Sequence, residues 1–259
     1  FVAGAVFIAG ALPTGCSEGE SSTTGRRISL DVKIAASAAS KQFSNSKGWN
    51  VTITKAVVAT GPLYFYDGEA ILAGTGSKRR VAPPRGAIKS AFAHPGHYVP
   101  GNAKGELRTG SSADLLVGAT LGVGEGVSGV VRSATFSFSS PARGPFAGEL
   151  GSHAMVIEGT ATKTAETRIF RAEIRADEVS DANGLPQIEG CPFAEADMTG
   201  DGIVTVSVGI ATWFDNVEFE GLPASVDGAP VLMTDSLARN QLVRGTRGAS
   251  AYSFSYASR

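Results

Sequence analysis

The stretch Ala134-Thr135-Phe136-Ser137-Phe138-Ser139 decides the fold class, because small or polar residues alternate with aromatic ones along it. Successive side chains of a β-strand point to opposite faces of the sheet, so this alternation places both phenylalanines on one face. The same period of two runs from Ile28 to Ile34, which is typical of a half-buried strand. These stretches predict a β-rich chain.

Further strand patterns and turn signals extend this prediction along the chain. The chain holds 33 glycines and 12 prolines, which favour frequent turns between short strands. Strand patterns cover residues 51–66 (two strands separated by a bend), 114–119, 127–138, 153–162, 167–176, 203–208, 217–219 and 251–256, and short helical patterns cover 37–43 and 235–243. We therefore predict an all-β fold, an antiparallel β-sandwich or irregular barrel with long loops, as a single β-rich domain over residues 27–259 with a loop insertion near 67–90.

The charge balance bears on the class of partner. The formal net charge is −1, and charged residues make up 18% of the chain. Nucleic-acid-binding proteins usually carry a basic excess or a basic stripe, so the composition argues against a nucleic-acid partner.

The N-terminal residues resemble an export signal. Residues 1–12 are almost wholly apolar, and as a helix they would span about 18 Å, too short for a bilayer core of about 30 Å. Thr14-Gly15-Cys16 and the polar stretch 17–24 resemble a bacterial lipoprotein cleavage site and its tether. We therefore expect residues 1–26 to be a leader and tether, with a lipid on Cys16 that anchors the protein to a membrane surface. The alternative is an ordinary secretory signal with an incidental cysteine.

The export signal determines the expected compartment. Lipidation of Cys16 would also leave the second cysteine without a disulfide partner. The predicted location is the periplasm, the outer membrane or the cell surface. If Cys16 is lipidated, Cys191 cannot form a disulfide, so the fold must depend on its core.

The sharpest local motif is His94-Pro95-Gly96-His97. Proline followed by glycine at the centre favours a type II β-turn, which keeps the first and fourth Cα atoms within about 7 Å. Two of the three histidines would then lie at the ends of one turn, where both imidazoles could reach a single metal ion. The alternative is a turn that is only architectural.

Three more residues complete the predicted metal site. His153 and Met155 are two residues apart in a strand pattern, so they could present nitrogen and thioether donors on one face, a pair that suits copper. Glu106 is a further candidate ligand, or a carboxylate that orients an imidazole. Copper is the preferred metal, and zinc with three histidines is the alternative.

Trp49 and Trp213 are the only tryptophans, and both are candidate site residues. We expect both to be core anchors rather than ligand platforms.

Several stretches together carry a family resemblance. They are Gly48-Trp49, Gly61-Pro62-Leu63-Tyr64-Phe65, His94-Pro95-Gly96-His97-Tyr98, Gly105-Glu106-Leu107, Asp114-Leu115-Leu116 and 213–219. They resemble a group of uncharacterised exported lipoproteins of myxobacterial type. More remotely, two histidines and an aromatic residue in an exported β-rich chain are similar to the periplasmic copper-binding proteins of methanotrophs. That resemblance implies copper as the bound metal.

These observations lead to two competing functions. The first is an exported, lipid-anchored, metal-binding protein that uses the His-Pro-Gly-His turn. The second is a structural, carbohydrate-binding or protein-binding surface module without a metal. No nucleophile motif is present in the sequence, so we expect a binding protein rather than an enzyme.

Overall fold

The structure is a computed structural model that describes residues 25–70 and 98–259. Its strands are β1 (Arg27–Ala36), β2 (Gln42–Ser44), β3 (Asn50–Ala59), β4 (Leu63–Tyr66), β5 (Ala103–Leu107), β6 (Ser112–Asp114), β7 (Ala119–Val127), β8 (Gly129–Ser137), β9 (Met155–Lys163), β10 (Glu166–Ile174), β11 (Gln187–Met198), β12 (Gly202–Val208), β13 (Val231–Leu232) and β14 (Tyr252–Ser258). The helices are α1 (Ala147–Leu150), α2 (Ile210–Phe214) and α3 (Leu237–Thr246), with short 3₁₀ turns at Ala38–Ser40, Ala176–Val179 and Ala249–Ala251.

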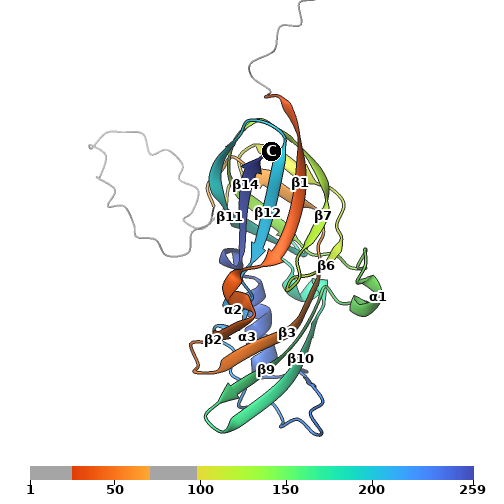
Figure 1. Ribbon diagram of the computed structural model, residues 1–259, viewed down its shortest axis with the longest axis vertical. Coiled ribbons are helices and arrows are strands. Elements are labelled where there is room, and N and C mark those ends of the chain that lie inside the picture. Colours follow the sequence, from red (N-terminus) through yellow and green to blue (C-terminus); the bar gives the residue numbers. More distant parts are fainter. Residues whose placement is uncertain (1–24, 71–97) are drawn as a thin grey trace, which may run out of the picture.

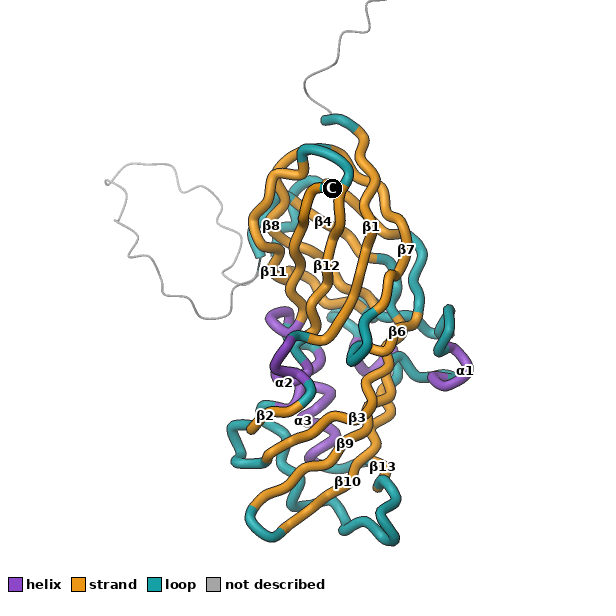
Figure 2. Tube along the Cα trace, viewed as in Figure 1, coloured by secondary structure: helices purple, strands orange, loops and turns teal. Residues whose placement is uncertain are grey.

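The described strands form a closed barrel and a second sheet. The barrel order is β1-β12-β14-β11-β8-β4-β5-β7, and the second sheet runs β13-β10-β9-β3-β2, with β6 paired to β3. The barrel occupies one end of the elongated molecule and the second sheet the other, with α2 and α3 between them (Figures 1 and 2). The predicted all-β fold is therefore confirmed, and of the two predicted architectures the structure contains the barrel.

The barrel contains both antiparallel and parallel strand pairs, so it is an irregular barrel rather than a purely antiparallel one. β1 pairs with β12 in parallel, and β11 pairs with β14 in parallel. The β11–β14 pair is parallel because the C-terminal strand β14 inserts between β11 and β12 and runs antiparallel to β12. Alternation along one strand does not encode which distant strand becomes its neighbour.

Side chains fill the interior of the barrel. Phe65, Phe193 and Phe254 form a triangle of rings with centroid separations between 5.8 and 6.0 Å. Phe136 and Phe138, predicted to share a face, are both buried, and their ring centroids lie 5.1 Å apart. The barrel is therefore a packed core, which places any ligand on its outer surface.

Glycines on β7 let its neighbour β5 approach closely. Gly124 lies opposite the buried Leu30 of β1, so it occupies an inward position. A Cβ atom added to Gly124 would lie 2.5 Å from the carbonyl oxygen of Glu106 on β5, closer than any side chain tolerates. Glycine at this position therefore allows β5 and β7 to approach closely enough to close the barrel.

Three local predictions differ from the structure. Of residues 114–119, the central four (115–118) form a turn between β6 and β7, because the Leu116 amide bonds to the Asp114 side chain and Gly118 has a φ of 81°. Residues 217–219 follow α2 without joining a sheet, and the helical pattern at 37–43 becomes a 3₁₀ turn and the start of β2.

One further prediction, the loop insertion, cannot be compared with the structure along most of its length. The predicted loop insertion near 67–90 lies mainly outside the described residues. Within residues 25–70 and 98–259, no helix has the length and apolar character needed to cross a bilayer.

Candidate functional site

The predicted metal ligands divide between described and undescribed parts of the chain. His94 and His97 lie outside the described residues, as does Cys16, so the metal site and the lipid anchor stay predictions. Glu106 lies on β5, where its Oε1 accepts bonds from Arg108 Nε at 2.8 Å and Nη2 at 2.6 Å. It is therefore engaged by a guanidinium rather than by an imidazole of the described chain.

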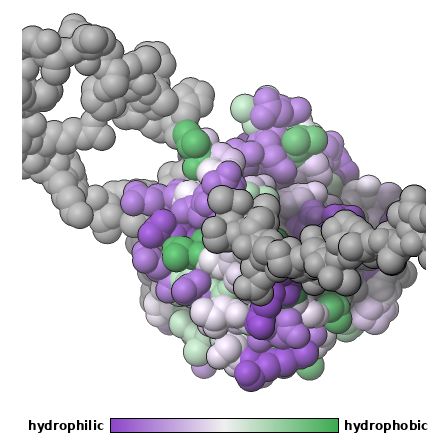
Figure 3. Space-filling view, turned by 90° about the horizontal axis from the view of Figure 1, so that it is seen from above, coloured by the Kyte–Doolittle hydropathy of each residue, from purple (hydrophilic) through white to green (hydrophobic). Residues whose placement is uncertain are grey.

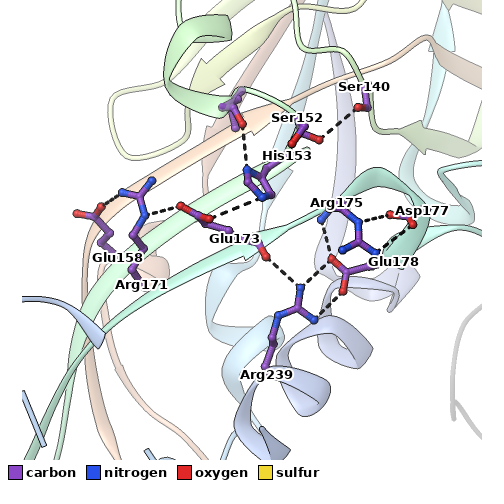
Figure 4. Close-up of polar contacts among 11 residues, drawn as sticks. Ser140, Ser152, His153, Glu158, Arg171, Glu173, Arg175, Asp177, Glu178 and Arg239 are labelled. Atoms are coloured by element: carbon purple, nitrogen blue, oxygen red, sulfur yellow. Dashed lines mark hydrogen bonds and ion pairs between the residues drawn. The ribbon is translucent and has the colours of Figure 1, made fainter. Parts of the chain in front are cut away.

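His153 lies just before β9, and its ring contacts a carbonyl and a carboxylate (Figure 4). Nδ1 is 3.2 Å from the Leu150 carbonyl oxygen, and Nε2 is 3.6 Å from Glu173 Oε2. Glu173 in turn accepts a bond from Arg171 at 2.7 Å. These contacts describe an imidazole held in a surface network of charges.

Met155 does not join this network. Its side chain is fully buried in the main core, and it lies opposite the buried Ile174 in the β9–β10 register, whereas Glu173 lies opposite Val156. Neighbouring residues of a strand face opposite sides, so Met155 and Glu173 lie on different faces of the sheet. The predicted nitrogen and thioether pair of His153 and Met155 is therefore not formed, because His153 precedes the strand and turns toward Glu173. Among the described residues, no group of three or more His, Cys, Asp or Glu side chains is arranged to hold a metal ion.

Both tryptophans are core residues, as expected. Trp49 is fully buried, and its Nε1 donates to Glu218 Oε1 at 2.6 Å. Trp213 on α2 is 1% exposed, and its Nε1 has no hydrogen-bond partner in the described part of the chain. Neither ring offers a face to a ligand.

Cys191 is also buried, and burial raises the pKa of its thiol to about 12, so it is a poor nucleophile and metal ligand.

A groove of about 920 Å³, which the sequence analysis did not predict, lies on the outer face of the barrel. It crosses β4, β5, β7 and β1, and its lining includes Tyr64, Tyr66, Lys104, Glu106, Glu125, Arg27 and Asp201. The strand register arranges the first row across these strands as Tyr64, Glu106, Glu125 and Ser29. Residues directly opposite in antiparallel strands share a face, so these side chains are neighbours in the groove.

Two tyrosines form the aromatic wall of this groove. Leu63 and Phe65 of β4 are fully buried, so the alternating Tyr64 and Tyr66 point outward and are half-buried. The Tyr98 ring packs edge-to-face on Tyr66 at 6.5 Å, and its hydroxyl lies 2.7 Å from Ser133 Oγ. This contact restricts the Tyr66 side chain in the free protein. Ligand binding would therefore cost less side-chain conformational entropy.

The hydroxyls of Tyr66 and Tyr98 have raised pKa values. Burial raises the pKa of Tyr66 above its ordinary value and raises that of Tyr98 to about 12. Both phenols are therefore protonated at neutral pH, and they can serve as hydrogen-bond donors.

The charges of the groove are only partly paired. Lys104 lies 3.6 Å from Asp67, and Asp201 accepts a bond from the Ser29 amide at 2.8 Å. Glu125 and Arg27 have no ion pair or side-chain hydrogen bond to another described residue. An unpaired carboxylate and an unpaired guanidinium in one groove are groups that a polar ligand can satisfy.

A second hollow of about 840 Å³ lies beside α2, α3 and the β2–β3 connection. Its charged lining includes Lys47, Asp215 and Arg244, and its aromatic residue is Trp213. Because Trp213 is almost fully buried, this hollow presents no aromatic face. The barrel groove, which has both outward-facing tyrosine rings and charged side chains without an ion pair, is therefore the better candidate for a binding site.

One sequence signal could have revealed the groove. The end of the predicted strand segment 51–66 alternates leucine or phenylalanine with tyrosine, and this alternation puts both tyrosines on one face. Comparison with known proteins adds no assignment, because no protein-family model, curated protein or solved structure gave a significant match to the chain.

Proposed function

We propose that this chain is an exported binding protein whose barrel groove holds a saccharide. The observation that supports this proposal best is the pair Tyr64 and Tyr66, side by side on β4, in a groove that also contains the carboxylates of Glu106 and Glu125. Of the two functions that the sequence left open, this is the surface-binding one.

The chemistry of a sugar matches this lining. A pyranose ring has an apolar face of C–H groups, which packs on an aromatic ring, and an edge of hydroxyls, which donate to carboxylates. Ligand sites in proteins combine apolar and aromatic surface with a few polar groups that fix orientation, and the groove has both. The rings supply contact area at low entropic cost, because a tyrosine has only two side-chain torsions to fix.

The described surface at the barrel end also favours a polar ligand. Viewed from the barrel end, the described surface is mainly hydrophilic, with hydrophobic residues scattered singly (Figure 3). Scattered apolar residues are normal for a soluble surface and do not form a docking patch on this face. The compartment in this proposal rests on the predicted export signal and on Cys16, because an exported, lipid-anchored protein would meet the polysaccharides of the envelope.

The proposal is tested by calorimetric titration of the purified chain with neutral oligosaccharides of several linkages. We expect saturable binding with one site. Tyr64→Ala should weaken it at least tenfold, about 1.4 kcal/mol, whereas Tyr64→Phe, which keeps the ring, should retain most of the affinity. A thermal melt of each variant checks that the barrel is intact. Absence of binding to every saccharide, or equal affinity of wild type and Tyr64→Ala, would overturn the proposal.

A further inference from the structure

Tyr98 lies behind the aromatic wall of the groove. It is not among the described residues that line the groove, but its ring packs edge-to-face on Tyr66, which does line it. The centroids of the two rings are 6.5 Å apart. A contact of this kind fixes the orientation of a side chain only if the supporting ring is itself held in place.

A chain of two hydrogen bonds holds the Tyr98 phenol. Ser133 lies opposite Tyr66 in the β4–β8 register, and its hydroxyl donates to the carbonyl oxygen of Gly68 at 2.7 Å. A serine hydroxyl has one proton, so at its second contact, 2.7 Å from the Tyr98 hydroxyl, the Ser133 oxygen accepts and Tyr98 donates. Ser133 is fully buried, so breaking either bond would leave a buried hydroxyl short of a partner.

The backbone that follows Tyr98 is fastened to the end of β4. The Gly68 amide donates to the carbonyl oxygen of Pro100 at 2.9 Å, and the Asn102 amide donates to Asp67 Oδ1 at 2.7 Å. A Cβ atom added to Gly68 would collide with the carbonyl oxygen of Pro100, so glycine permits this close approach. Tyr98 is therefore anchored both through its hydroxyl and through the backbone beside it.

We infer that Tyr98 and Ser133 are positioning residues of the groove, which hold the Tyr66 ring in the orientation that receives the ligand. The inference rests on the proposed function and adds to it how the site is preorganised. A ring that is already held in one orientation loses less conformational entropy on binding. Immobilising one side chain at an interface corresponds to a factor of roughly 2 to 12 in affinity.

The orientation of Tyr66 is measured first in the free protein. Three-bond couplings about its χ1 torsion, recorded on the isotopically labelled full chain, distinguish one staggered rotamer from an average over several. We expect one rotamer in wild type and averaged couplings in Tyr98→Ala. Tyr256→Phe is the matched control, because it removes a tyrosine hydroxyl that donates to the Gly200 carbonyl oxygen, three strands away from β4 in the barrel, and it should leave the Tyr66 couplings unchanged.

The affinity of the same variants is then measured by titration with the oligosaccharide that wild type binds. Tyr98→Ala should weaken binding by a factor of roughly 2 to 12. Tyr98→Phe and Ser133→Ala keep the ring but break its anchor, so each should cause a smaller change of the same kind, both in the Tyr66 couplings and in affinity. A thermal melt of each variant reports stability separately, and these two variants test the inference should Tyr98→Ala fail to fold.

The outcomes separate this inference from the proposed function. Tyr66 couplings that stay unchanged when the Tyr98 ring or its anchor is removed overturn the inference and leave the proposed function standing. Averaged couplings with unchanged affinity also overturn it, because the ligand would then not depend on a fixed Tyr66 ring. Absence of saccharide binding by wild type contradicts the proposed function, whereas the couplings still decide whether Tyr98 orients Tyr66.

Discussion

The side-chain amide of Asn45 donates a hydrogen bond to the carbonyl oxygen of Val217 at 2.8 Å. The two residues are 172 positions apart in the chain, and the bond ties the β2–β3 connection to the segment that follows α2. Asn45 also donates to the Phe214 carbonyl at 3.1 Å and accepts from the amides of Lys47 and Trp49, each at 3.0 Å. Asn45 is 6% exposed. One buried side-chain amide therefore connects the β2–β3 connection of the second sheet to the end of α2 and the residues that follow it.

Replacing Asn45 should therefore destabilise the whole molecule. Asn45→Ala removes the side-chain bonds to two buried carbonyls and two amides, of which the Phe214 carbonyl keeps the Val217 amide as a second donor, and we expect a loss of about 3 kcal/mol in the free energy of unfolding. Asn45→Asp should be at least as harmful, because it sets a carboxylate against two carbonyl oxygens. Chemical denaturation measures the loss. The exposed Asn240→Ala on α3 is the control, and an equal effect of both alanine variants would contradict the role given to Asn45.

The close approach of β5 and β7 gives a second prediction. Gly124→Ala would force a Cβ atom to within 2.5 Å of the Glu106 carbonyl oxygen, so we expect destabilisation of roughly 1–3 kcal/mol. Gly148→Ala in α1 is the matched control, since its added Cβ meets nothing within 4 Å. Alanine is the better helix former, so this control should be neutral or stabilising. Thermal unfolding compares the two, and a Gly124→Ala protein as stable as wild type would show that the strands are not in this contact.

The Arg239–Glu178 ion pair gives a prediction about pH. Arg239 donates to both carboxylate oxygens, at 2.6 and 2.8 Å, and the Arg175 amide donates to Oε2 at 2.8 Å. Burial alone would raise the pKa of Glu178, but these bonds outweigh it and hold the pKa below its ordinary value of 4.5. A carboxylate whose pKa is lowered on folding stabilises the fold above its unfolded pKa, and that stabilisation is lost as the pH falls through the folded pKa.

Glu178→Gln should therefore cost about 1–3 kcal/mol at neutral pH, between the values for exposed and buried ion pairs. The difference from wild type should shrink once the pH falls below 4.5. Denaturation at several pH values measures this. Glu220→Gln removes an exposed carboxylate that pairs with Lys163, and it should change little at any pH. A constant difference between Glu178→Gln and wild type down to strongly acidic pH would be inconsistent with the assigned ion pair.

The strands that the sequence predicted well are those in which every second side chain enters the core. Ile28 to Ile34 alternate cleanly, and all four apolar residues of that run are buried in β1. The helical pattern at 235–243 also matches α3, whose Ser236 caps the Arg239 amide. In both elements local periodicity and burial agree.

Two strands that the sequence did not predict, β7 and β11, lack a regular apolar period, and the reason is physical. β7 places glycines at its inward positions because β5 approaches closely, so its apolar pattern disappears. β11 contains two irregularities in its pairing with β8, one of them beside Cys191, and these interrupt its period. Tertiary contacts decide both cases, and a single-sequence pattern does not contain them.

The groove could not be predicted for a similar reason. Tyr64, Glu106 and Glu125 come from three strands, and only the barrel register places them in one row. The sequence identified Glu106 as a ligand candidate, but it assigned the residue to a metal with His94 and His97 rather than to its cross-strand neighbours. Patterns within a strand show which face a residue takes, whereas the identity of the neighbour depends on strand order.

The most direct measurement of the central claim is the position of the ligand on the barrel. Backbone amide chemical shifts of the isotopically labelled chain are recorded while a binding oligosaccharide is added. The account predicts shift changes concentrated in β4, β5 and β7, at the amides of Tyr64, Lys104 and Glu125, with the hollow beside α2 and α3 unchanged. Changes confined to that hollow, or to the surroundings of His153, would contradict the assignment of the groove as the binding site.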